Sequence, residues 1–227
     1  MVDTQLHSPE GVAISPDGTV YVADHWYERI YYFTALGSFK GHWLLPSFLG
    51  PDGYQYTRPD GVAVAPDGKV YVTERFARGV HYYSPTGSFI GQWQSPDLGD
   101  AYPPFPEAIS VAPNGNVYVC YPYSKGRVRY FRGSGSFLGA WGPEGSGDGQ
   151  FLYSKGIAIA PDGVVYVLDR NYTPRIQYFT PSGSFIGKWG SEGKGDGQFD
   201  HPAGIAVAPN GVVYVTDKSN NCVQYFT

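Results

Sequence analysis

The ten residues Pro-Glu-Gly-Val-Ala-Ile-Ser-Pro-Asp-Gly at positions 9–18 return as Pro-Asp-Gly-Val-Ala-Val-Ala-Pro-Asp-Gly at positions 59–68. Looser copies follow farther along the chain. The corresponding starts are Gly11, Gly61, Ala108, Gly156 and Gly204, which gives spacings of 50, 47, 48 and 48 residues. Self-similarity at a fixed period of this size is typical of repeat architectures. The sequence therefore predicts five copies of one structural unit.

Each copy is a series of short β-prone segments separated by turns. The first segment, such as Gly156-Ile-Ala-Ile-Ala160, mixes β-branched and small residues, which suits an inner strand where several units converge. A Pro-Asp-Gly or Pro-Asn-Gly turn, a Val-Tyr-Val strand, an aromatic strand such as 175–180 and a Ser-Phe-Ile-Gly-Lys-Trp strand follow. One such meander cannot bury both faces alone, so the copies must pack together. The sequence predicts an all-β fold, a five-bladed β-propeller formed as a single domain by residues 1–227.

The fifth copy is shorter than the others. The Gly-Ser-Phe strand begins at Gly37, Gly87, Gly135 and Gly183, whereas the fifth copy reaches Phe226-Thr227 without one. We therefore expect the fifth blade to lack its outermost strand, which leaves an open edge at Val223–Phe226. Such an edge invites pairing with another chain, and it predicts weak self-association of a closed monomer. Three interpretations remain: a solvated edge, a propeller that continues beyond residue 227, or a strand supplied by another chain.

The chain resembles the NHL-repeat β-propellers. The resemblance rests on Gly-Ile-Ala-Val-Ala-Pro-Asn-Gly-Val-Val-Tyr-Val-Thr-Asp at 204–217, Arg-Ile-Gln-Tyr-Phe-Thr at 175–180 and the stretch 183–199. It covers almost the whole chain, although members of that family often have six blades. Such propellers include protein-binding, RNA-binding and lyase members, so the resemblance implies a fold and not one function.

Composition excludes several classes of protein. The net charge is −4, so no general basic field exists to hold nucleic acid or an anionic membrane, and neither is expected as a partner. The two cysteines, Cys120 and Cys222, are too few for a disulfide framework, and both are expected to remain thiols. No apolar run has the length of a membrane span, and the first ten residues lack the pattern of a secretory signal. These features leave the localisation open, cytoplasmic for a complete chain and extracellular for an excised domain.

A binding site is expected on one face of the propeller, which we call the top face. It carries the linkers between blades and the hairpins at 24–29, 74–78, 121–127, 169–175 and 217–221. The Pro-Asp-Gly turns of the opposite face hardly vary, whereas these hairpins do, and variable loops on a rigid scaffold are where binding usually resides. The candidate ligand-binding residues are Asp24, Glu74, Asp169 and Asp217, together with Trp26, Tyr27, Phe76, Tyr121, Tyr123 and Tyr172.

These residues allow two interpretations. Aromatic platforms and charged groups suit a pocket for a protein, peptide or glycan ligand. Alternatively, each carboxylate recurs because a short acidic side chain satisfies backbone N–H groups of its hairpin. Arg29, Arg127 and Arg175 would then be structural partners of those acids. Tyr121 stands where the other blades have an acid, so blade three is expected to make a specialised contact.

The first functional hypothesis is a non-enzymatic binding or scaffold module that uses no cofactor. Local catalytic signatures such as Gly-x-Ser-x-Gly or His-Glu-x-x-His do not occur in the sequence. The alternative is an NHL-like lyase or hydrolase with a top-face site, with or without a metal. His7, His25 and His201 all map to the top face, as do the histidines that lyases of the family use. This alternative predicts His25, His201 and a carboxylate within hydrogen-bond or metal-ligand reach of one another.

Overall fold

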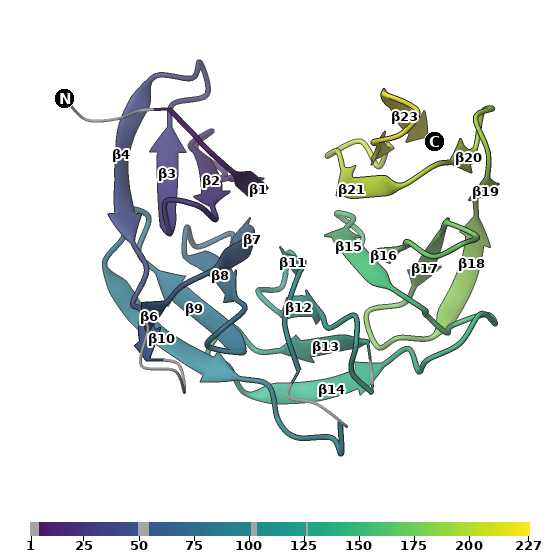
Figure 1. The fold of residues 1–227 in the computed structure, drawn as a ribbon, viewed down its shortest axis with the longest axis horizontal. Coiled ribbons are helices and arrows are strands. Elements are labelled where there is room, and N and C mark those ends of the chain that lie inside the picture. The colour runs from purple at the N-terminus through teal and green to yellow at the C-terminus, as the bar shows by residue number, and fades with distance from the viewer. Residues whose placement is uncertain (1–4, 50–54, 101–103, 126) are drawn as a thin grey trace. The chain divides into compact units, whose positions relative to one another are not determined.

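The computed structural model describes residues 5–49, 55–100, 104–125 and 127–227. Within these ranges the regular elements are all β-strands, as predicted (Figure 1). The described residues include no helix with the length and apolar character that spanning a membrane requires. The chain divides into two compact units: unit 1 comprises Met1–Pro96 and Phe105–Ile109, and unit 2 comprises Asp97–Pro104 and Ser110–Thr227. The single-domain organisation stays a prediction, and each unit is described by itself.

Unit 1 contains two antiparallel four-stranded blades, each ordered as a meander. Blade one consists of β1 (Pro9–Ile14), β2 (Val20–Asp24), β3 (Arg29–Phe33) and β4 (Phe39–Leu44). Blade two consists of β7 (Pro59–Val64), β8 (Val70–Glu74), β9 (Gly79–Tyr83) and β10 (Phe89–Gln94). A short hairpin of β5 (Phe48–Leu49) and β6 (Gln55–Tyr56), which the sequence analysis did not predict, lies in the connection between them.

Unit 2 contains the remaining blades. Blade three consists of β11 (Ile109–Val111), whose first residue belongs to unit 1, β12 (Val117–Cys120), β13 (Val128–Phe131) and β14 (Phe137–Trp141). Blade four consists of β15 (Ser154–Ile159), β16 (Val165–Asp169), β17 (Arg175–Phe179) and β18 (Phe185–Trp189). Blade five consists of β21 (Pro202–Val207), β22 (Val213–Asp217) and β23 (Cys222–Phe226). In the linker before it, β19 (Ser191–Glu192) and β20 (Gln198–Phe199) form a short parallel pair.

The shorter fifth blade is confirmed: it is a three-stranded sheet in the order β21-β22-β23. Val223 and Tyr225 of β23 are 59% and 69% exposed. Pairing of this edge with another chain stays a prediction. The two cysteines form no disulfide, since Cys120 is buried in blade three and Cys222 lies exposed in blade five.

The innermost strands approach each other closely, as the small residues predicted. A Cβ atom added at Gly11 in β1 would lie 2.7 Å from the backbone oxygen of Asp60 in β7. Neighbouring blades are also tied by a recurring hydrogen bond from a tyrosine in the second strand to a turn of the next blade. Tyr21 donates to the Pro85 carbonyl at 2.9 Å, and Tyr118 donates to the Pro181 carbonyl at 3.0 Å. The blades of each unit therefore form a rigid support for their hairpins.

In three of the top-face hairpins the residue directly before the blade's third strand has a left-handed backbone: Glu28 (φ 55°), Arg78 (φ 57°) and Asn221 (φ 52°). This conformation costs an L-residue about 1–2 kcal/mol, whereas glycine loses only about 0.5–1 kcal/mol in entropy. We expect Glu28→Gly to raise the free energy of unfolding by about 0.5–1 kcal/mol, measured by urea denaturation. Glu28→Ala is the matched control, because it removes the same side chain and keeps the backbone cost. Equal stability of the two variants would contradict the prediction.

Candidate functional site

The four candidate carboxylates are all buried and all bind backbone amides. Asp24 accepts hydrogen bonds from the amides of His7 at 2.7 Å and Tyr27 at 3.1 Å. Glu74 accepts hydrogen bonds from the amides of Arg58 and Ala77. Each of these side chains joins the linker before its blade to the hairpin that follows β2 or β8. These hydrogen bonds are the ones expected if each acid recurs because it satisfies backbone N–H groups of its hairpin. A role of the same acids in ligand binding stays a prediction.

In unit 2 the same arrangement occurs at Asp169 and Asp217, the last residues of β16 and β22. Asp169 accepts from the amides of Leu152 at 3.1 Å and Tyr153 at 2.9 Å. Asp217 accepts from the amide of Asp200 at 3.0 Å. The carboxylates therefore fix where each linker lies against its hairpin.

Burial raises the pKa of Glu74 to about 7, from an ordinary value of 4.5, because the low-dielectric surroundings disfavour the charged form. A raised pKa in the folded state stabilises the protein at acidic pH, and this contribution is lost as the pH rises through about 7. We expect the free energy of unfolding of the wild type to fall by about 2–3 kcal/mol more than that of Glu74→Gln between about pH 5 and pH 8. Denaturant titrations of both proteins across this range measure the difference. Parallel pH profiles would contradict the prediction.

The candidate aromatic residues of unit 1 lie in two separate hairpins. Trp26, 65% exposed, stacks on the imidazole of His7 with ring centroids 4.7 Å apart. Tyr27 packs edge-on against the same imidazole at 5.8 Å. Phe76 lies in the hairpin of blade two and is 44% exposed. A contact of these rings with a ligand stays a prediction.

Blade three, which has Tyr121 in place of a hairpin carboxylate, uses an acid from its linker that the repeat pattern did not indicate. Tyr121 is fully buried, and the guanidinium of Arg129 lies 5.0 Å from its ring centroid. Arg129 forms a buried ion pair with Asp100 at 2.5 Å, and Asp100 also accepts a hydrogen bond from the amide of Lys125. An acid from the linker therefore takes the place that a hairpin acid holds in the other blades.

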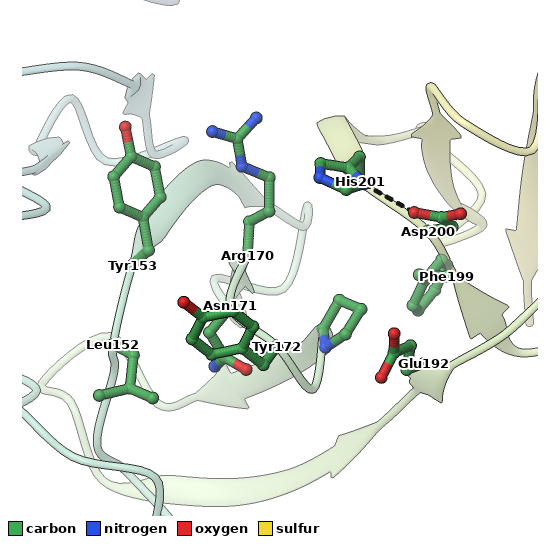
Figure 2. Close-up of a pocket in the computed structure, with 10 residues that line it drawn as sticks. Leu152, Tyr153, Arg170, Asn171, Tyr172, Glu192, Phe199, Asp200 and His201 are labelled. Carbon is green, nitrogen blue, oxygen red and sulfur yellow. Dashed lines mark hydrogen bonds and ion pairs between the residues drawn. The ribbon is translucent and has the colours of Figure 1, made fainter.

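A pocket of about 480 Å³ lies in unit 2, between the hairpin of blade four and the linkers before blades four and five (Figure 2). Its lining residues are Leu152, Tyr153, Arg170, Asn171, Tyr172, Pro174, Glu192, Phe199, Asp200 and His201. Of the candidate ligand-binding residues, Tyr172 lines the pocket directly, with 93% of its surface exposed. Tyr123 is 64% exposed and packs edge-on against Tyr153 at 5.4 Å, so it supports one wall.

One wall of this pocket carries a paired histidine and aspartate. Nδ1 of His201 lies 2.6 Å from Oδ1 of Asp200 (Figure 2). The hairpin of blade five holds both residues: Asp217 accepts from the Asp200 amide, and the amides of Lys218 and Ser219 donate to the carbonyls of His201 and Asp200. The backbone at His201 is left-handed, with φ 57°. These constraints bring together two adjacent side chains that an extended strand would point to opposite sides.

The sequence analysis named His201 but not Asp200 or Arg170. The available signal was the adjacency of the acid and the histidine before the proline that opens β21. His7 and His25 belong to unit 1 and His201 to unit 2, so their convergence stays a prediction. Over the part of the chain that the structure describes, no group of three or more His, Cys, Asp or Glu side chains is arranged to hold a metal ion.

Two family models match parts of the chain. An NHL repeat model matches residues 199–226, and a model of the SMP-30/gluconolactonase/LRE-like region matches residues 1–101. These matches confirm the resemblance to NHL-type β-propellers. No curated protein matches this propeller as a relative.

Solved structures similar to this propeller include two enzymes and one protein complex. A streptogramin B lyase matches with a TM-score of 0.72 and 18% identity over 100% of this chain and 67% of that chain. A gluconolactonase from Xanthomonas campestris matches with a TM-score of 0.68 and 16% identity over 97% and 76%. A chain of a nidogen/laminin complex matches with a TM-score of 0.70 and 18% identity over 96% and 75%. Identities this low show the β-propeller fold alone.

The prediction of a non-enzymatic binding or scaffold module is wrong on these findings. The family model over residues 1–101 favours the enzymatic alternative instead. The prediction failed because it relied on local catalytic motifs. A propeller can assemble its reactive groups from separate linkers and hairpins, and no single stretch of sequence then carries the signature.

Proposed function

We propose that this NHL-type propeller is a lyase- or lactonase-type enzyme that opens a cyclic ester in the pocket of unit 2. The observation that carries the proposal is the hydrogen-bonded pair of His201 and Asp200 at the pocket wall. A histidine oriented by a carboxylate is a common general acid and base. The lactonase and lyase types of the similar proteins support this choice of reaction.

The hydrogen bond between His201 and Asp200 gives the two nitrogens of the His201 ring different roles. With Nδ1–H donating to Asp200, the other nitrogen, Nε2, carries the free lone pair and points toward the Arg170 side of the pocket (Figure 2). In hydrolysis, Nε2 takes a proton from water while the water oxygen bonds to the ester carbonyl carbon. The carbon–oxygen bond of the ring then breaks, and the same proton passes to the departing alkoxide. The product is a hydroxy acid.

The same base also supports elimination, the second candidate, which the likeness to a streptogramin B lyase favours. In that case Nε2 removes a proton from the carbon next to the one that bears the ester oxygen. The electron pair forms a carbon–carbon double bond, and the ester oxygen leaves as part of a carboxylate. This product is an isomer of the substrate, whereas the hydrolysis product contains one additional water.

Mass spectrometry of a lactone panel tests the proposal. The purified protein is incubated with a sugar lactone, simple aliphatic lactones and a streptogramin B antibiotic, beside protein-free controls. We expect at least one substrate to open faster with the protein. A mass increase of one water indicates a lactonase, and ring opening at unchanged mass indicates a lyase. Rates equal to the protein-free controls across the panel would contradict the proposal.

A further inference from the structure

Resting on the proposed function, we infer that Arg170 binds a carboxylate of the substrate, so that the enzyme acts on cyclic esters that also carry one carboxylate group. Arg170 lines the same pocket as the paired His201 and Asp200. In Figure 2 its guanidinium and the imidazole of His201 reach the same end of the pocket. A carboxylate held by Arg170 would therefore place the rest of the substrate within reach of the proposed base.

The Arg170 side chain is held in place before any ligand arrives. Its backbone amide donates to the carbonyl of Tyr153 at 2.8 Å, directly after β16 ends. Its guanidinium lies over the ring of Tyr153, 5.2 Å from the ring centroid. Tyr123 in turn packs edge-on against Tyr153 at 5.4 Å. A guanidinium fixed on an aromatic face loses little conformational entropy when it binds an anion.

Among the residues that the structure describes, the guanidinium of Arg170 has no hydrogen-bond or ion-pair partner. Two acidic side chains, one adjacent to Arg170 in the sequence and one in the pocket lining, are already engaged. Asp169 accepts from Arg175 at 3.2 Å, and Asp200 pairs with His201 at 2.6 Å. Arg175, in the same hairpin, also donates to three backbone carbonyls, so it is a structural cation. Arg170 is therefore the cation of this pocket that remains available to a ligand.

The rest of the pocket indicates what the carboxylate is attached to. Leu152, Tyr172, Pro174 and Phe199 provide apolar surface for a carbon skeleton. Glu192 lies at the end of the pocket away from Arg170 (Figure 2), where it would repel a second anionic group. A planar guanidinium matches one carboxylate through two parallel N–H···O bonds. These features favour a monoanion with an apolar body over a dianion such as phosphate.

A binding experiment tests the anion site without turnover. Phenylacetate, phenylacetamide and inorganic phosphate are titrated into the wild type, Arg170→Gln, Arg170→Lys and Arg132→Gln by calorimetry. Arg132 is the matched control, because it is an exposed arginine of unit 2 outside the pocket lining. We expect Arg170→Gln to weaken phenylacetate binding at least 10-fold, Arg170→Lys to weaken it less, and Arg132→Gln to leave it unchanged. Equal affinity in the wild type and Arg170→Gln, or phosphate binding that is as tight and as dependent on Arg170, would overturn the inference.

A kinetic experiment separates this inference from the proposed function. A lactone carrying a carboxylate is compared with its methyl ester, which removes the charge. We expect the wild type to favour the acid at least 10-fold in kcat/KM, and Arg170→Gln to raise KM for the acid alone. Turnover without this preference and without dependence on Arg170 would overturn the inference and leave the proposed function standing. Carboxylate binding without turnover of any lactone would retain the anion site and contradict the proposed function.

Discussion

Replacing His201 by asparagine is expected to lower kcat for opening of a cyclic ester by about 100- to 10,000-fold, the usual contribution of a positioned acid or base. Asparagine removes the base but tolerates the left-handed backbone that His201 adopts. The carbonyl of residue 201 still accepts from Lys218, so the linker keeps its anchor. Steady-state kinetics beside thermal unfolding curves measure the two effects separately.

A matched control for His201→Asn is His42→Asn in unit 1. His42 lies in β4, and its imidazole packs on the ring of Tyr31 with centroids 5.5 Å apart, outside the pocket. We expect His42→Asn to keep the kcat of the wild type. A folded His201→Asn protein that also keeps that kcat would remove His201 from the mechanism.

The fold was predictable because the short sequence motifs that determine it are local and occur in every copy. The Pro-Asp-Gly turn and the Val-Tyr-Val strand recur at a fixed period, so each copy reinforces the same assignment. The ranges of β15 and β17 accordingly differ from the expected segments by one or two residues at their ends. The short parallel pair of β19 and β20 was not predictable in the same way, although the linker before blade four has its counterpart in a parallel bridge between Glu144 and Phe151. The glycine-rich stretch between the paired residues shows no alternation of apolar and polar residues that would indicate a strand.

The candidate site was predictable in its location but not in its chemistry. The sequence placed the hairpins and linkers on one face and named Tyr172 and His201. The contacts that show what each side chain does join residues far apart in the sequence, such as Asp100 and Arg129. The pattern of residues within one repeat does not predict such contacts. The pair of Asp200 and His201 depends on a left-handed backbone at His201, a conformation that residues other than glycine adopt infrequently and that the sequence pattern does not indicate.

Replacing Asp169 by alanine is expected to lower the free energy of unfolding by about 3–5 kcal/mol, the usual effect of breaking a buried ion pair. Asp169 is fully buried, and it is the carboxylate partner of Arg175. The substitution leaves the guanidinium of Arg175 buried with only carbonyl partners. It also leaves the amides of Leu152 and Tyr153 without their acceptor. Urea denaturation measures the loss.

Asp148→Ala is the matched control, because Asp148 pairs with Lys188 in an exposed contact between the linker and β18, with side chains 54% and 46% exposed. Removing an exposed pair costs about 0–1 kcal/mol. Comparable losses in the two variants would contradict the structural role of Asp169.

The Asp169→Ala substitution also tests how the pocket is held together. Asp169 joins the linker that carries Tyr153 to the hairpin that carries Arg170. If Asp169 acts by fixing this junction, Asp169→Ala must weaken phenylacetate binding even at temperatures where the protein remains folded, although Asp169 itself does not line the pocket.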